Sequence, residues 1–214
     1  MEPSARLIIN LTGDKSFYLW NGLETYYKKL RAAYTDILND LNSEYLYFGF
    51  FTLCASTLEY SLNFILADYC IDKFGPENYK TYCKEYIGLS FQNKLLMIPH
   101  IISDGKYMLN ENHPSFNQLE DLITLRNRIL HNKEFLKEIN IPIQGELIDG
   151  IVIVPIEKSE VEFSIDVATN YIDTLTKDKC INYGNALGDF KQFIMTPALT
   201  KDLKENPMIK EQTW

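Results

Sequence analysis

Most of the chain shows apolar residues that return every three or four positions, which is the spacing of one face of an α-helix. This pattern predicts about five helices. The second should end near Gly75-Pro76, because the residue before a proline disfavours the helical conformation. Pro99 should kink or end the third, because a proline inside a helix removes a backbone hydrogen bond. The predicted helices span residues 17–41, 90–102, 116–137 and 165–179, and the second helix carries an apolar stripe from Phe51 to Tyr69.

The hydrophobic pattern changes its period after Pro142. Residues 143–148 and 151–156 favour strands, and the Asp149-Gly150 dipeptide between them is typical of a tight turn. We therefore expect a β-hairpin insertion over residues 143–163, placed before the last long helix.

The two ends of the chain carry weaker patterns. The first ten residues should be a short extended or loose segment. Residues 196–214 are polar and contain two prolines, so this tail should be loosely held. Together these patterns predict a mainly α fold in one domain over residues 1–214: a helical bundle of about five helices with a small inserted β-hairpin.

Composition limits the function. A chain of 214 residues is long enough for one well-buried domain. Its net charge of -8 argues against a generic electrostatic nucleic-acid binder. A local basic patch remains, because Arg126, Arg128, Lys133 and the neighbouring His131 occur in a stretch without any acid. The overall charge therefore weakens a nucleic-acid function without excluding it.

We expect no metal, no cofactor and no membrane span. The four cysteines form no C-x-x-C pair, and their spacing to the three histidines is a poor match to zinc sites. Reduced thiols in a core explain them better. The apolar stretch 46–70 contains Glu59, Asn63 and Asp68, which favours a buried helix over a membrane span. Without a signal peptide at the N-terminus, we expect a cytoplasmic protein.

One arginine lies in an unusual position. At roughly 100° per residue, Arg126 falls near the middle of the apolar face of the predicted helix 116–137. Asn127 and His131 lie one turn apart on its flank, and Arg128 points away. An arginine in a core stripe is costly unless it meets a carboxylate, a phosphate or a second molecule. It could form a structural salt bridge between helices, or it could belong to a binding site.

The neighbouring side chains suit phosphodiester chemistry without a metal. The imidazole of His131 is the side chain best able to move protons near neutral pH. The guanidinium of Arg126 can hold a phosphoryl oxygen. Asn127 can orient the histidine or the substrate, and Arg128 and Lys133 are candidates for RNA binding. We therefore predict Arg126, Asn127 and His131 as the catalytic residues.

Residues 119–131 resemble the signature helix of the HEPN superfamily, which carries an arginine, a polar residue, three variable residues and a histidine. The helical core from about 17 to 180 is similar to the family's layout. The resemblance implies a metal-independent endoribonuclease in which the ribose 2′-hydroxyl attacks the adjacent phosphate. His131 would then transfer a proton and Arg126 would contact the scissile phosphate. The family forms its site at a two-fold interface, so the resemblance implies a homodimer.

The resemblance leaves the biological context open. Such an enzyme could be a toxin or defence effector, controlled by an antitoxin or another regulatory protein. The toxin subgroup that carries a tyrosine three residues beyond the histidine is a poorer match, because that position here is Glu134.

Glu59 is a supporting candidate and an ambiguous one. It lies on the flank of the second predicted helix, where it could pair with Arg126 or remain a solvated acid. Two other interpretations therefore stand beside the ribonuclease. One is a non-catalytic module that binds a nucleotide, RNA or a protein partner. The other is a purely structural pair of Glu59 and Arg126, with the motif arising by chance.

Overall fold

The computed structural model describes residues 5–9, 16–39, 43–130, 146–148, 151–153, 171–194 and 206–212. Six helices and three two-stranded antiparallel sheets lie in these ranges, which confirms the mainly α prediction. The helices are α1 (Leu23–Asn39), α2 (Glu44–Phe74), α3 (Tyr79–Ile87), α4 (Phe91–Ile102), α5 (Pro114–Leu130) and α6 (Lys177–Ile194). The strands are β1 (Ala5–Ile9), β2 (Ser16–Trp20), β3 (Tyr107–Leu109), β4 (Glu146–Ile148), β5 (Ile151–Ile153) and β6 (Ile209–Glu211).

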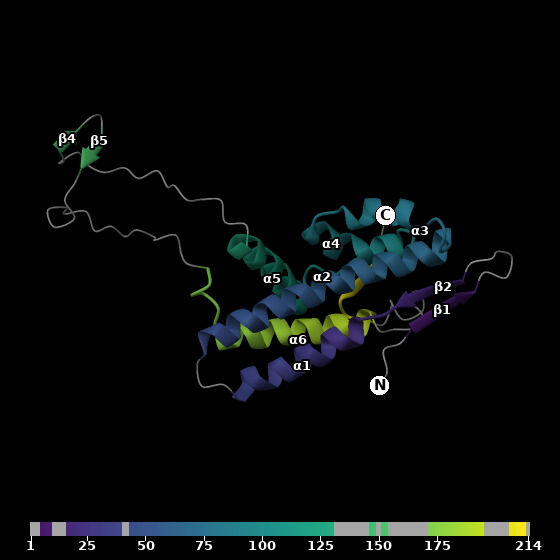
Figure 1. Ribbon diagram of the computed structural model, residues 1–214, viewed down its shortest axis with the longest axis horizontal. Coiled ribbons are helices and arrows are strands. Elements are labelled where there is room, and N and C mark those ends of the chain that lie inside the picture. The colour runs from purple at the N-terminus through teal and green to yellow at the C-terminus, as the bar shows by residue number, and fades with distance from the viewer. Residues whose placement is uncertain are drawn as a thin grey trace.

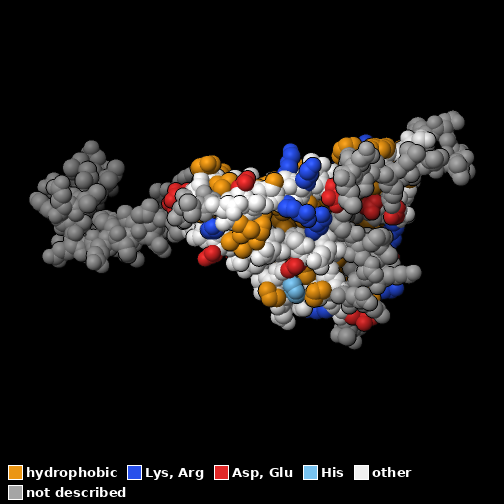
Figure 2. Space-filling model, turned by 90° about the horizontal axis from the view of Figure 1, so that it is seen from below, with side chains coloured by type: hydrophobic (Ala, Val, Ile, Leu, Met, Phe, Trp, Pro, Cys, Tyr) orange, Lys and Arg blue, Asp and Glu red, His pale blue; other side chains and the backbone are white. Residues whose placement is uncertain are grey.

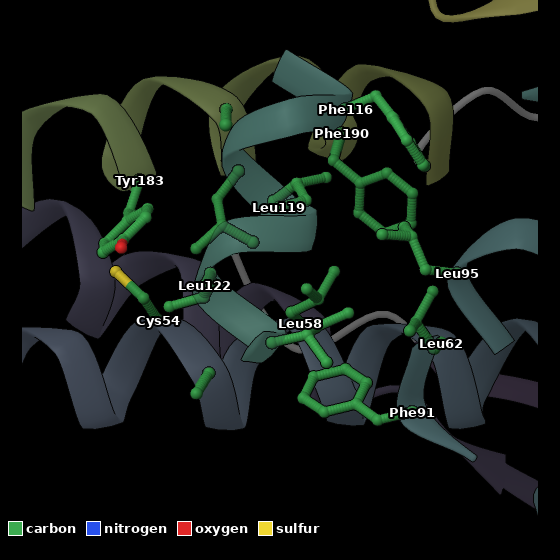
Figure 3. Close-up of a cluster of buried hydrophobic side chains, with 14 of the residues drawn as sticks. Cys54, Leu58, Leu62, Phe91, Leu95, Phe116, Leu119, Leu122, Tyr183 and Phe190 are labelled. Atoms are coloured by element: carbon green, nitrogen blue, oxygen red, sulfur yellow. The ribbon is translucent and has the colours of Figure 1, made fainter. Parts of the chain in front are cut away.

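The long helix α2 is the centre of the bundle. Figure 1 shows α1 and α6 along one side of it and α3 and α4 along the other, while α5 packs against both α2 and α6. The apolar stripe predicted for α2 is the middle of the core. Figure 3 shows its side chains meeting those of α4, α5 and α6, and burial of each large apolar side chain contributes about 1.5–3 kcal/mol. The labelled α2 residues in this cluster are Cys54, Leu58 and Leu62, each with no exposed surface.

Local signals set the ends of two helices as predicted. The helix α2 stops before Gly75, whose φ of +80° places it in the left-handed region and whose N–H donates to the carbonyl of Ile71. Ser90 caps α4 by accepting a hydrogen bond from the N–H of Asn93 at 3.2 Å. Pro99 lies inside α4, which ends three residues later at Ile102.

The start of the first predicted helix is wrong. Residues 17–20 belong to strand β2, which pairs with β1, and the extended segment expected in the first ten residues is confirmed for β1. Exposure alternates along β2, with Tyr18 and Trp20 exposed, as the side chains of a strand point to opposite faces in turn. The helix begins only at Leu23, whose N–H donates to the side chain of Asn21.

The last predicted helix is wrong in its bounds. Residues 171–174 form a turn and α6 begins at Lys177, while 165–170 lie outside the described residues. The hydroxyl of Thr176 accepts a hydrogen bond from the N–H of Lys179, as an N-cap side chain does. This cap explains the later start.

Two further differences concern the helices before it. The nine-residue helix α3 was not predicted, because it is too short for a clear period. The helix predicted as the fourth is α5, and residues 131–137 at its predicted end lie outside the described residues. Ser115 lies in the first turn of α5 and donates a hydrogen bond to Asp189 of α6.

The predicted hairpin is confirmed where the structure describes it. Strands β4 and β5 pair antiparallel, with Ile148 opposite Ile151 across the Asp149-Gly150 dipeptide. The remaining parts of the 143–163 insertion lie outside the described residues.

The C-terminal tail departs from its predicted loose state over residues 206–212. Strand β6 pairs antiparallel with β3, and Met208, just before it, is 1% exposed. The backbone of Asn110 also donates to the carbonyl of Met208 at 2.8 Å. This segment is anchored because β3 offers it backbone partners and a buried apolar position.

We expect Met208→Ala to lower the free energy of unfolding by about 2–5 kcal/mol, the range for truncating a buried methionine. Urea denaturation followed by circular dichroism measures the change. Lys210→Ala, an exposed position two residues away, is the matched control and should leave stability unchanged. Equal stability of the two variants would contradict an anchored tail.

The described part of the chain contains one helix, α2, that is long and apolar enough to span a membrane. Within the bundle, 56% of its most apolar window is buried, as in the core helix of a globular protein. All four cysteines are buried and free, as expected for core thiols. Burial raises the pKa of the Cys180 thiol to about 11, so this thiol is protonated and unreactive near neutral pH.

Candidate functional site

Arg126 lies near the C-terminal end of α5 and forms an ion pair with Glu59 of α2. The distance from its Nη2 to Oε2 of Glu59 is 3.6 Å. The arginine side chain is 23% exposed and the glutamate side chain 40% exposed. Of the two alternatives for Glu59, the pair is therefore the one present, although its carboxylate also faces solvent. The pair joins two helices that are far apart in the sequence.

Two further contacts hold the guanidinium of Arg126. The ring of Phe91 on α4 lies 5.8 Å from its Cζ, within the range of a cation–π interaction. Its Nη1 donates to Oδ1 of Asn127 at 3.0 Å. The helical projection predicted that Arg126 lies near the middle of the apolar face of its helix. In the structure its guanidinium lies instead at the edge of the core. The difference arises because the side chain extends past the apolar stripe toward the carboxylate and the surface.

The other predicted site residues divide into those that the structure describes and those that it does not. Asn127 is exposed and accepts a hydrogen bond from Arg126. Arg128 is also exposed, but its guanidinium lies 5.3 Å from the ring centre of Tyr171, away from that contact. His131 and Lys133 lie outside the described residues, which end on this helix at Leu130. The structure thus brings together Arg126, Asn127 and Glu59.

Sequence reasoning missed a buried lysine beside this pair. Lys94 of α4 is only 5% exposed, and its Nζ donates to Oδ1 of Asn63 at 2.8 Å. Asn63 lies one turn beyond Glu59 on α2. A signal was present, because Lys94 falls at helical spacing between Phe91 and Ile98, both buried. A positively charged residue within the apolar stripe of a helix is the same sequence feature that identified Arg126 as a candidate.

We call Glu59, Asn63, Lys94 and Arg126 the polar cluster. It holds two cations and one carboxylate, so its formal charge is positive in a protein whose net charge is -8. Burial lowers the pKa of Lys94, and the nearby charge of Glu59 opposes that shift. The cluster can therefore fix a guanidinium near the surface and favour an anion beside it.

Lys94→Met should flatten the dependence of stability on pH in the alkaline range. The pKa of Lys94 is lowered in the folded state, so the unfolded state binds its proton more tightly. Stability therefore rises as the pH increases from the folded pKa of Lys94 to the ordinary lysine value. Below the folded pKa the ammonium is present in both states, and its unfavourable contribution to stability is constant. Methionine removes this contribution while keeping a similar apolar stem.

Urea denaturation at pH values from about 7 to 10 measures the effect of Lys94→Met. We expect the variant to be at least as stable as the parent at neutral pH, since half-exposed Asn63 can bond to water instead. Lys84→Met, at an exposed position on α3, is the control and should keep the parent's pH profile. An unchanged alkaline rise in the Lys94 variant would contradict the assignment.

Comparisons of this chain with protein-family models, with curated protein sequences and with solved structures find no match. The residues that the structure describes contain no group of three or more His, Cys, Asp or Glu side chains placed to hold a metal ion. The candidate site therefore rests on its own geometry and on the sequence motif at residues 126–131.

Proposed function

We propose that this protein is a metal-independent endoribonuclease whose site is formed by Arg126, Asn127 and His131. One observation carries the proposal: the guanidinium of Arg126 is held at the edge of the bundle by Glu59 and Phe91, with the exposed amide of Asn127 beside it. A cation already fixed in place stabilises developing negative charge without the cost of reorganising in the transition state.

The proposed reaction is an internal transfer of a phosphoryl group. His131 accepts the proton of the ribose 2′-hydroxyl, and the 2′-oxygen then forms a bond to the adjacent phosphorus. The bond from phosphorus to the 5′-oxygen breaks, and this oxygen takes up a proton. The products are a 2′,3′-cyclic phosphate and a 5′-hydroxyl end. Arg126 binds the non-bridging oxygens, where negative charge is concentrated.

Each remaining residue of the site has a proposed role. Glu59 positions the guanidinium of Arg126 through their 3.6 Å ion pair, and the phosphate contacts the guanidinium from its exposed side. Asn127 orients His131 or the RNA. Arg128 and Lys133 contact the RNA backbone and offset the repulsion from the protein's net negative charge.

The proposal includes an assembly and a setting. Two copies of the chain form a homodimer whose motifs face each other across one cleft, so that the second histidine can donate the proton to the leaving 5′-oxygen. The enzyme acts in the cytoplasm as a toxin or defence effector, under the control of an antitoxin or another regulatory protein.

Incubating the purified protein with a mixed RNA pool in the presence of a chelator tests the proposal. We expect fragments with cyclic phosphate and 5′-hydroxyl ends, and analytical ultracentrifugation should show a dimer at the same concentration. Intact RNA, or cleavage that needs added Mg²⁺, would refute the metal-independent reaction. A strict monomer that still cleaves would refute the composite site.

The alternative function is a non-catalytic module that binds a nucleotide, RNA or a protein partner. The observation that favours it is the ion pair itself, since Glu59 already neutralises part of the charge of Arg126. Fluorescence anisotropy with labelled RNA distinguishes the two functions. Under the alternative, RNA binds and stays intact, and Arg126→Ala weakens binding.

A further inference from the structure

A hollow lies between α1 and α6, two helices that contribute nothing to the polar cluster. Its volume is about 170 Å³. One wall is a single helical stripe of α1, and the other is a stripe of α6. Figure 2 shows the side of the molecule seen from below, where Lys and Arg side chains gather near the centre beside apolar ones. The lining residues from α1 are Tyr27, Leu30, Arg31 and Tyr34, and those from α6 are Gly184, Gly188 and Lys191.

Two glycines one turn apart on α6 have different effects on this hollow. A Cβ at Gly184 would lie 2.5 Å from the ring of Tyr34, so this glycine lets the ring pack against the helix backbone. A Cβ at Gly188 would have no atom within 4 Å. Glycine inside a helix is less favourable than alanine by about 1 kcal/mol, and at Gly188 no close packing requires it. The space beside Gly188 is therefore open.

The chemistry of the walls is mixed. Tyr27 and Tyr34 contribute aromatic rings, and the nearly buried Leu30 contributes an apolar side chain. Arg31 is exposed and forms no ion pair within the described part of the chain. Lys191 pairs with Glu24 at 3.5 Å, and its Nζ lies 5.2 Å from the ring centre of Tyr27. The hollow thus combines an aromatic lining with an available guanidinium at its rim.

We propose that this hollow, the α1–α6 pocket, binds a small aromatic anion. Its ring enters beside Gly188 between the two tyrosines, and its acidic group pairs with Arg31. Pockets for drug-sized ligands measure about 300–1,000 Å³, so this one accommodates a single ring and not a larger molecule. A planar guanidinium suits a phosphate or a carboxylate, because both accept two parallel hydrogen bonds. The pocket does not depend on ribonuclease activity.

Isothermal titration calorimetry of the 214-residue protein with phenyl phosphate tests the pocket. We expect a Kd below about 1 mM. Inorganic phosphate, which lacks the ring, and phenol, which lacks the charge, should each bind at least about 10-fold more weakly. Equal binding of inorganic phosphate would overturn the proposal, because it would show a surface charge effect without a pocket.

Two variants locate the binding. Gly188→Leu fills the open space, and Arg31→Met removes the charge at an exposed position that does not threaten the fold. Each should weaken binding of phenyl phosphate at least about 10-fold, a loss of about 1.4 kcal/mol. Lys29→Met, an exposed change on α1 outside the pocket, should bind as the parent does. Parent-like binding by Arg31→Met, or no binding by the parent, would overturn the proposal.

Discussion

Replacing His131 with alanine is expected to lower the rate of RNA cleavage at least about 100-fold, the usual contribution of a general base. Arg126→Ala should produce a loss of similar size, since it removes the charge that binds the phosphate. Initial rates on a labelled RNA in the presence of a chelator measure both losses. The two variants test the same site through different steps of the reaction.

The fold should survive the change at Arg126. Its partner Glu59 is 40% exposed, so the carboxylate can be hydrated when the guanidinium is gone. Circular dichroism and sedimentation should therefore match the parent for Arg126→Ala. Arg128→Ala is the matched control on the same helix, because its guanidinium lies over Tyr171 and away from Arg126. It should weaken RNA binding modestly and leave the cleavage step nearly unchanged. Full cleavage by both the His131 and Arg126 variants would rule out the proposed site.

Alanine at Gly184 and at Gly188 should change stability in opposite directions. At Gly184 the new Cβ meets the ring of Tyr34, whose hydroxyl donates to Asn185 at 2.9 Å and whose ring lies beside Phe50. These contacts resist displacement of the ring, so overpacking should cost about 1–3 kcal/mol. At Gly188 the Cβ enters open space, and the better helix propensity of alanine should add up to about 1 kcal/mol.

The paired glycine variants control for each other, because both replace the same residue type inside α6. The gain in helix propensity is common to both variants, so urea denaturation should separate them by the overpacking cost, about 1–3 kcal/mol in the free energy of unfolding. If Gly184→Ala were as stable as Gly188→Ala, the close approach of Tyr34 to α6 would be wrong. This outcome would also remove the basis for the shape of the α1–α6 pocket.

Part of the site was accessible from the sequence. The oddity of Arg126 on an apolar stripe predicted that it needs a partner, and Glu59 was one candidate. Lys94 carried the same signal on a shorter helix but was overlooked, because Phe91, Leu95 and Ile98 dominate the pattern around it. That these residues share one cluster depends on how α2, α4 and α5 pack, which residue spacing within each helix does not specify.

The amino-acid sequence by itself determined the main helical stripes, the end of α2 at Gly75 and the β4–β5 hairpin. Each of these follows from neighbouring residues: a repeated spacing, a backbone that must turn, or a tight-turn dipeptide. The tertiary structure alone decided that residues 17–20 form a strand and that the tail is anchored at β6. Their apolar residues are too few for a clear period, so the backbone partners in β1 and β3 set their conformation. The same holds for the polar cluster, because charges on separate helices meet only once the core has packed.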